Sequence, residues 1–172
     1  QQITWRARAI DPALSPDGRK LVFTSRKELY NGDPGSSGGS NVYAYDNLYT
    51  MDIQSNELTR VPLGSIQDYE IERPVFNSNG DKIIFSAKPQ DGRWQIYLYN
   101  ITTGGITSLF SCLENTRFPY FSPDDRFVVF TTDYDGDEEI QIFDTENPNI
   151  RVSVTQNNVR DSFPVWSPLY RD

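Results

Sequence analysis

Histidine is absent from this 172-residue sequence, and cysteine and methionine occur once each. Without histidine, the chain by itself forms neither a Ser-His-Asp or Cys-His catalytic set nor a histidine-ligated metal site. The single cysteine, Cys112, can close no internal disulfide and cannot build a cysteine-rich zinc site. We therefore expect no catalytic residues within this chain, and no cofactor.

Basic residues are also scarce, because 16 Lys and Arg stand against 24 Asp and Glu, which gives a net charge of −8. A protein that binds duplex DNA normally presents a basic face, and a single-strand binder needs an electropositive groove. No stretch reaches the roughly 18 apolar residues of a membrane span. These absences argue against a nucleic-acid partner and against a transmembrane segment.

The sequence does contain an internal repeat, which begins with a proline and continues into a turn. The four copies are spaced by 62, 45 and 45 residues, and they read PALSPDG from residue 12, PVFNSNG from 74, PYFSPDD from 119 and PVWSPLY from 164. In the first three copies an apolar run follows at the same distance, at residues 21–23, 83–85 and 128–130. Two further runs then match in the same order, so each copy is a structural unit.

Each unit predicts four short strands. Proline, Asp or Asn, and glycine favour a tight turn after the first strand. The second strand is continuously apolar, which indicates burial on both faces, whereas a β-sandwich would show alternation. No segment has a sustained helical period. The predicted fold is all-β: a β-propeller made of four-stranded antiparallel blades of about 45 residues each.

The repeats also predict the boundaries of the blades. Residues 1–4 are expected to form the outer strand of a preceding or closing blade, and 164–172 the inner strand of a further blade. Three blades at 12–63, 74–110 and 119–155 are expected to be complete. Three blades leave apolar faces and strand edges uncovered. Either the chain is part of a longer ring, which we favour, or two copies associate to complete one.

The first blade carries an insertion at 26–46, which includes the flexible tract NGDPGSSGGS. A tolerated surface insertion is the simpler interpretation. The alternative is a binding loop in which Tyr30, Tyr43 and Tyr45 anchor a partner.

The predicted topology places most of the excess negative charge on one side of the propeller. Loops between second and third strands and the connections between blades should emerge on one side, and together they hold 14 acidic and 7 basic residues, whereas the rest of the chain holds 10 and 9. The negative potential on that side favours a basic protein or peptide, or a cation; acidic loops that merely aid solubility are the alternative. These segments are 25–46, 64–73, 87–94, 111–118, 132–139 and 156–163.

Two groups of candidate site residues lie in these segments. The residues just before each inner strand are expected to ring the channel mouth: Glu72 and Arg73, Arg117 and Phe118, and Ser162 and Phe163. Glu72, Arg117 and Asp161 are expected to contact a partner, whereas Phe118 and Phe163 are expected to pack between blades. The acidic run DYDGDEE offers Asp133, Asp135 and Asp137 as oxygen ligands for calcium, although its glycine does not stand where an EF-hand requires it. An Asp-Gly turn between two strands is the alternative explanation of that run.

The repeats resemble the TolB-like, WD40-like propeller repeat, whose pattern is Pro-x-Trp-Ser-Pro-Asp-Gly, an apolar strand, an Asp-Gly loop and an Ile-Tyr strand. PVWSP from residue 164, SPDG from 15 and QDGRWQIY from 90 carry the resemblance. Blade two departs from it with Asn77-Ser78 in place of Ser-Pro, and blade three with Asp125 in place of glycine.

The resemblance implies a bacterial, exported or periplasmic protein that acts as a non-catalytic scaffold for a protein or peptide partner. Similar repeats also form the gating propeller of prolyl-oligopeptidase-like serine peptidases. In that alternative the catalytic domain would lie outside this sequence. The fold by itself does not decide between the two.

Overall fold

The computed structural model describes residues 9–25, 47–109, 113–147 and 150–167. In these ranges twelve strands form three four-stranded antiparallel sheets, and the strands pair in chain order within each sheet. This confirms the predicted all-β propeller architecture with four-stranded blades. The described residues contain no helix that is long and apolar enough to cross a membrane. The strands are β1 (Ala9–Leu14), β2 (Lys20–Ser25), β3 (Asn47–Asp52) and β4 (Leu58–Arg60), then β5 (Glu70–Phe76), β6 (Lys82–Lys88), β7 (Gln95–Asn100) and β8 (Ile106–Ser108), and finally β9 (Thr116–Phe121), β10 (Phe127–Thr132), β11 (Glu139–Asp144) and β12 (Arg151–Ser153).

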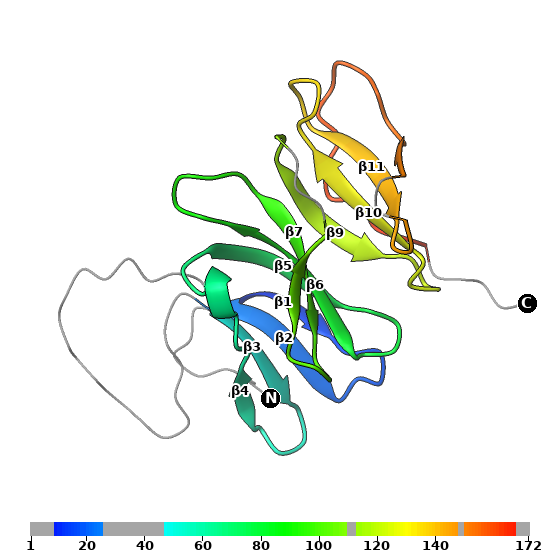
Figure 1. Ribbon diagram of the computed structural model, residues 1–172. Helices are drawn as coiled ribbons and strands as arrows, with labels where there is room; N and C mark the ends of the chain where they lie inside the picture. The colour runs from blue at the N-terminus through cyan, green and yellow to red at the C-terminus, as the bar shows by residue number, and fades with distance from the viewer. Residues whose placement is uncertain (1–8, 26–46, 110–112, 148–149, 168–172) are drawn as a thin grey trace, which may run out of the picture.

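The three sheets follow one another in space in the order of the chain, from the blue and cyan first sheet through the green second sheet to the yellow and orange third (Figure 1). A 3-10 turn, η1 (Gly64–Ile66), lies on the connection from β4 to β5. Each inner strand (β1, β5 and β9) begins three or four residues before the proline that opens its repeat. The prolines therefore lie inside the strands.

The hydrophobic core lies between the sheets. One cluster joins Val22 and Leu48 of the first sheet to Ile71, Ile83 and Phe85 of the second. All five residues are no more than 1% exposed. The second strand of each sheet is buried along most of its length, as its continuous apolar sequence predicts. The second sheet contacts the first sheet on one side and the third sheet on the other.

The turns after β1 and β9, in blades one and three, are held by the same network of side-chain hydrogen bonds. The Ser15 hydroxyl donates to the Asp17 carboxylate at 2.6 Å and accepts from the Lys20 backbone N–H at 2.8 Å. Ser122 and Asp124 make the equivalent bond in blade three. The serine hydroxyl, followed by a backbone N–H, lowers the pKa of both aspartates.

Acid should therefore weaken this turn network. A carboxyl whose pKa is lower in the folded protein stabilises the fold above the ordinary aspartate pKa of about 3.9, and this contribution is lost as the pH falls through the folded value. We expect a Ser15→Ala/Ser122→Ala variant to melt below the wild type at pH 6. The difference should narrow between pH 4 and pH 3, as differential scanning calorimetry would show. Ser65→Ala, an exposed control in η1, should follow the wild type, and a constant difference would contradict the prediction.

The two departures from the repeat pattern contact each other across the boundary between the second and third sheets. The carboxylate of Asp125 accepts hydrogen bonds from the Ser78 backbone N–H at 2.7 Å, from the Ser78 hydroxyl at 2.8 Å and from the Asn77 amide at 3.0 Å. Asp125 holds the positive φ of 59° that the pattern assigns to glycine. The departure from the repeat pattern at Asn77-Ser78 in blade two is thus matched by the departure at Asp125 in blade three.

The inner strands share a backbone feature at the residue before each repeat proline. Asp11, Arg73, Phe118 and Phe163 have φ values of 50°, 51°, 56° and 60°, a region that residues other than glycine seldom occupy. In the three inner strands, this position coincides with a shift of the strand register, as in a β-bulge. A bulge redirects a side chain at a fixed place in each blade.

The segment after the third sheet lies along β9. The Trp166 indole N–H donates to the Tyr120 carbonyl at 3.2 Å. Residues 164–167 form no strand, because a strand needs a hydrogen-bonded neighbouring strand and the described part of the chain supplies none beside them. The rest of the inner strand predicted at 164–172, and the outer strand predicted at 1–4, lie outside the described residues.

Candidate functional site

The loops that carry the acidic residues meet at one edge of the sheets. The Trp94 backbone N–H, in the loop from β6 to β7, donates to the side-chain oxygen of Asn115 at 2.9 Å. Asn115, on the connection between the second and third sheets, donates its own N–H to Asp133 at 2.7 Å. One blade further on, the Asp161 N–H donates to the Glu138 carbonyl at 2.6 Å. Where the structure describes these segments, they form a continuous loop edge.

Part of the acidic run 133–139 is used to join these loops. Both carboxylate oxygens of Asp133 accept hydrogen bonds from Asn115, one from its backbone and one from its side-chain amide. Glu138 forms a two-pronged ion pair with Arg160, with N–O distances of 2.8 and 2.9 Å. These two residues therefore have structural partners.

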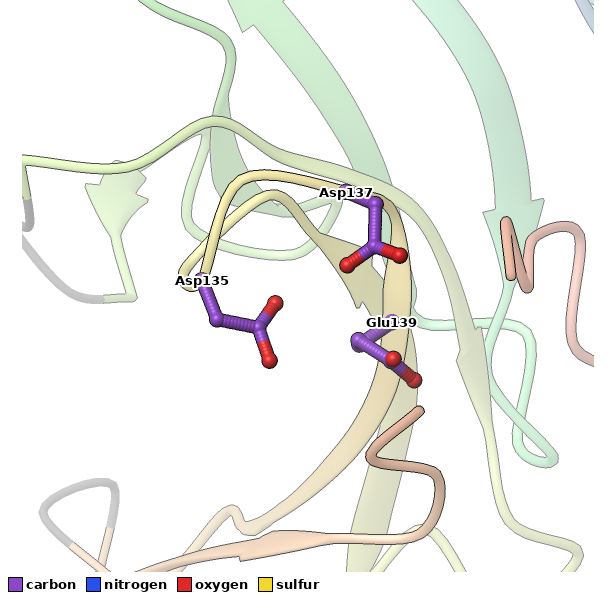
Figure 2. Close-up of side chains that lie close together, drawn as sticks. All are labelled: Asp135, Asp137 and Glu139. Carbon is purple, nitrogen blue, oxygen red and sulfur yellow. The ribbon is translucent and has the colours of Figure 1, made fainter. Parts of the chain in front are cut away.

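Three other carboxylates gather at the start of β11 and point toward one another (Figure 2). In Asp135, Asp137 and Glu139, one carboxylate oxygen of each lies within 4.8 Å of the others. Glu139 is 3% exposed and accepts hydrogen bonds from the Thr155 hydroxyl and, at 2.7 Å, from the Asn157 N–H. Desolvation, followed by the negative charges of Asp135 and Glu139, raises the pKa of Asp137.

This arrangement changes the set of residues that could hold calcium. Asp133, which the sequence suggests as a ligand, is directed to Asn115, and Glu139 takes its place in the group with Asp135 and Asp137. Carboxylate oxygens are the ligands that calcium prefers. A calcium site here stays a prediction.

Substituting Asp137 should reveal the repulsion between these carboxylates. The raised pKa means that ionised Asp137 destabilises the folded state at neutral pH, so Asp137→Asn should raise the melting temperature in the absence of calcium. If calcium binds, it should raise the melting temperature of the wild type and have less effect on the variant. Asp91→Asn, in the corresponding loop of blade two, is the control and should respond as the wild type does. If calcium left the melting temperature of the wild type unchanged, the prediction of a calcium site would be wrong.

The candidate contact residues Glu72 and Arg117 lie against each other. The Arg117 guanidinium donates two hydrogen bonds to the Glu72 carboxylate, both 2.7 Å long, and joins the second and third sheets. Arg117 also lies over the rings of Trp94 and Phe118, with distances to the centroids of 4.7 and 4.5 Å. The hydrogen bonds to Glu72 raise the pKa of Arg117. Any partner would meet these two side chains as an ion pair.

The remaining candidate contact residues are placed differently. The Asp161 carboxylate accepts a hydrogen bond from the Asn157 amide at 2.7 Å, within the loop edge. Tyr30, Tyr43 and Tyr45 lie outside the described residues.

A cleft of about 580 Å³ faces the channel side of the inner strands. Its lining includes the four repeat prolines and the four positive-φ residues that precede them. Phe118 and Phe163 stack with their centroids 4.2 Å apart, and the Arg73 guanidinium lies over both rings, at 5.9 and 5.2 Å. Phe118 is buried, as expected of packing between blades, whereas Phe163 lines the same cleft and is 51% exposed, so the expected burial is wrong for Phe163.

The repeat places Arg73, Phe118 and Phe163 at the channel mouth, but it does not predict that they line one cleft together with Asp11 and the repeat prolines. The position immediately before each repeat proline carries Asp, Arg, Phe and Phe in turn. An identical position in successive blades places these side chains next to one another around the channel.

Comparison with known proteins identifies the family. The family model of the TolB beta propeller domain matches residues 1–170. Among solved structures, the putative TolB of Agrobacterium tumefaciens matches 89% of this chain with a TM-score of 0.69 and 19% identity. TolB of Acinetobacter baumannii matches 94% with a TM-score of 0.67 and 22% identity, and a puromycin hydrolase matches 91% with a TM-score of 0.64 and 16% identity.

The matched region is only part of each of these proteins. The chain spans 51% of the Agrobacterium protein, 36% of the Acinetobacter protein and 23% of the puromycin hydrolase. At these identities the three structures show the fold alone. The sequence repeat, the three four-stranded sheets and the family match over residues 1–170 agree, and the chain belongs to the TolB β-propeller domain family.

Proposed function

We propose that the chain is a non-catalytic scaffold whose acidic loop edge binds a basic protein or peptide. The charge distribution carries this proposal, since the loop segments hold 14 acidic and 7 basic residues. Asp135 and Asp137 pair with no basic side chain in the described residues, so they remain available to a cationic partner. Charge of one sign at an edge speeds the association of an oppositely charged partner.

The absence of histidine supports a scaffold, because a serine peptidase of the usual kind needs a histidine base. The similarity to the puromycin hydrolase keeps a second candidate, in which the blades gate access to a peptidase domain outside this sequence. The match covers 23% of the puromycin hydrolase. The TolB family favours an exported, periplasmic location for the scaffold.

Binding should depend steeply on salt if the loop edge attracts its partner by charge. A lysine-rich peptide labelled with fluorescein is a suitable probe, and its affinity should fall at least tenfold between about 50 and 200 mM salt. Asp135→Asn/Asp137→Asn should weaken binding, whereas Asp17→Asn, on the opposite edge of the first sheet, should not. Binding that is independent of salt would contradict the proposal.

We further propose that two copies can associate through the outer face of the third sheet. Ile150, Val152 and Val154 are each more than 50% exposed there. The residues aligned with Val154 in the other two blades, Val61 and Leu109, pack against the blade that follows. An exposed apolar face at this place favours contact with another sheet.

Replacing Val154 with lysine should therefore reduce association. A buried charge would have to be desolvated at the interface, so the dimer fraction seen by analytical ultracentrifugation at micromolar concentration should fall severalfold. Thr107→Lys, at an exposed position of β8, is the matched control and should leave association unchanged. A wild type that stays monomeric throughout would contradict the proposal.

A further inference from the structure

We propose that the cleft on the channel side binds the free C-terminus of the basic partner, with Arg73 holding the terminal carboxylate and the cleft walls holding an apolar last side chain. This inference rests on the proposed function, because it assumes that the partner is a peptide or a protein. It adds the part of the partner that is recognised and the residue that recognises it.

The guanidinium of Arg73 is available for a carboxylate. Its side chain is 51% exposed. The carboxylate of Asp11 accepts a hydrogen bond from the Arg73 backbone N–H at 3.0 Å and forms an ion pair with Nε at 3.5 Å. Within the described residues the two terminal nitrogens of the guanidinium donate no hydrogen bond, so they can donate to a ligand. Two parallel N–H groups match the two oxygens of a carboxylate.

The aromatic rings beneath Arg73 set its position. Phe118 and Phe163 lie at 5.9 and 5.2 Å from the guanidinium carbon, and stacking of a guanidinium on aromatic faces restricts its movement without occupying its N–H groups. The rings also exclude water from one side of the guanidinium, which strengthens a charge-assisted hydrogen bond.

The rest of the cleft is suited to an apolar side chain. Leu14, Tyr120 and Val165 line it and are 59%, 41% and 74% exposed. A volume of about 580 Å³ lies within the range of sites that bind small ligands, which usually combine apolar walls with a few polar groups. The inner strands also keep strained residues at the cleft in every blade, and such strain is often retained at binding sites.

The cleft and the acidic loop edge are a few residues apart. Arg73 lies three residues into β5, which begins at Glu70 beside the loops. Three residues of extended chain span about 10 Å. A peptide whose basic residues lie three or four positions before its C-terminus can therefore contact both surfaces at once.

The test compares one peptide in two chemical forms. The probe is the pentapeptide Lys-Lys-Gly-Ser-Leu with an N-terminal fluorescein, prepared as the free acid and as the carboxamide, and fluorescence anisotropy gives the Kd of each. The carboxamide is more positive by one charge, so the acidic protein would prefer it on general electrostatics. The proposal predicts the reverse order, with the free acid binding at least tenfold more tightly.

Variants of cleft residues test whether the preference for the free acid arises in the cleft. Arg73→Gln should abolish the difference between acid and carboxamide, and Arg73→Lys, which keeps the charge but lacks two parallel donors, should restore only part of it. Phe163→Ala changes a half-exposed side chain and should weaken binding of the acid severalfold. If Arg73→Gln fails to fold, two measurements still test the proposal. They are the ratio of the carboxamide Kd to the acid Kd for the wild type, and the Kd of the acid for Phe163→Ala.

The outcomes separate the two proposals. If the carboxamide binds as well as the acid, and Asp135→Asn/Asp137→Asn weakens both, the C-terminal proposal is overturned and the acidic-edge scaffold stands. If neither form binds, both are overturned. An acid preference that persists in Arg73→Gln would place the carboxylate elsewhere and overturn the assignment of Arg73.

Discussion

Replacing Phe130 with alanine is expected to lower the free energy of unfolding by about 3–5 kcal/mol, the largest loss from any single change considered for this protein. Phe130 is fully buried in the cluster that joins the second and third sheets, where Ile84, Ile96 and Phe143 are its neighbours. The substitution leaves a cavity that the sheets on both sides cannot fill. Urea unfolding followed by tryptophan fluorescence would measure the loss.

The control lies on the connection that leads into the same blade. Leu113→Ala removes an apolar side chain that is 86% exposed, and it should cost less than about 0.5 kcal/mol. If Phe130→Ala were as mild as this control, the sheets would not depend on the packing between them, and the propeller account of stability would be wrong.

Replacing Arg117 with alanine is expected to cost about 2–3 kcal/mol. The change removes two hydrogen bonds to Glu72, whose carboxylate is only 16% exposed and would remain charged without its partner. It also removes the contacts of the guanidinium with Trp94 and Phe118. For a chain of this length, the melting temperature should fall by roughly 4–12 °C.

A double-mutant cycle separates the ion pair from the loss of packing. Glu72→Ala, Arg117→Ala and the double variant should show a coupling of about 1–2 kcal/mol, since the two residues are in direct contact. Arg126→Ala is the matched control: its side chain is 57% exposed and reaches Asp144 at 3.4 Å, so it should cost about 0.5 kcal/mol or less. If the losses of stability from Glu72→Ala and Arg117→Ala simply added in the double variant, the two side chains would not interact, contrary to the ion pair described here.

The repeat was sufficient to predict the blades, because a proline, a turn and an apolar run recur at fixed spacing and each has a direct structural meaning. The burial of both faces of β6 and β10 follows from their sequence for the same reason. Both are local properties of the chain, which a single sequence expresses.

Contacts between blades were much harder to predict. Glu72 and Arg117 are 45 residues apart, and Asp125 and Ser78 are 47 apart, so their pairing depends on how successive sheets are staggered. The sequence alone presents Glu72 and Arg117 as free charges, and Asn77-Ser78 and Asp125 as unrelated departures. The repeat places three of the cleft residues at the channel mouth, but the cleft also depends on the positive φ before each proline, which the residue types at that position do not indicate.

We propose that the acidic loop edge, and not the opposite edge of turns, is the binding surface. The most direct test is an NMR titration of the isotopically labelled protein with the lysine-rich peptide. We expect the amide chemical shifts to change in the loop segments 87–94, 113–118, 133–139 and 156–163. Shift changes confined to the opposite turns, at 15–19, 77–81 and 122–126, would contradict it.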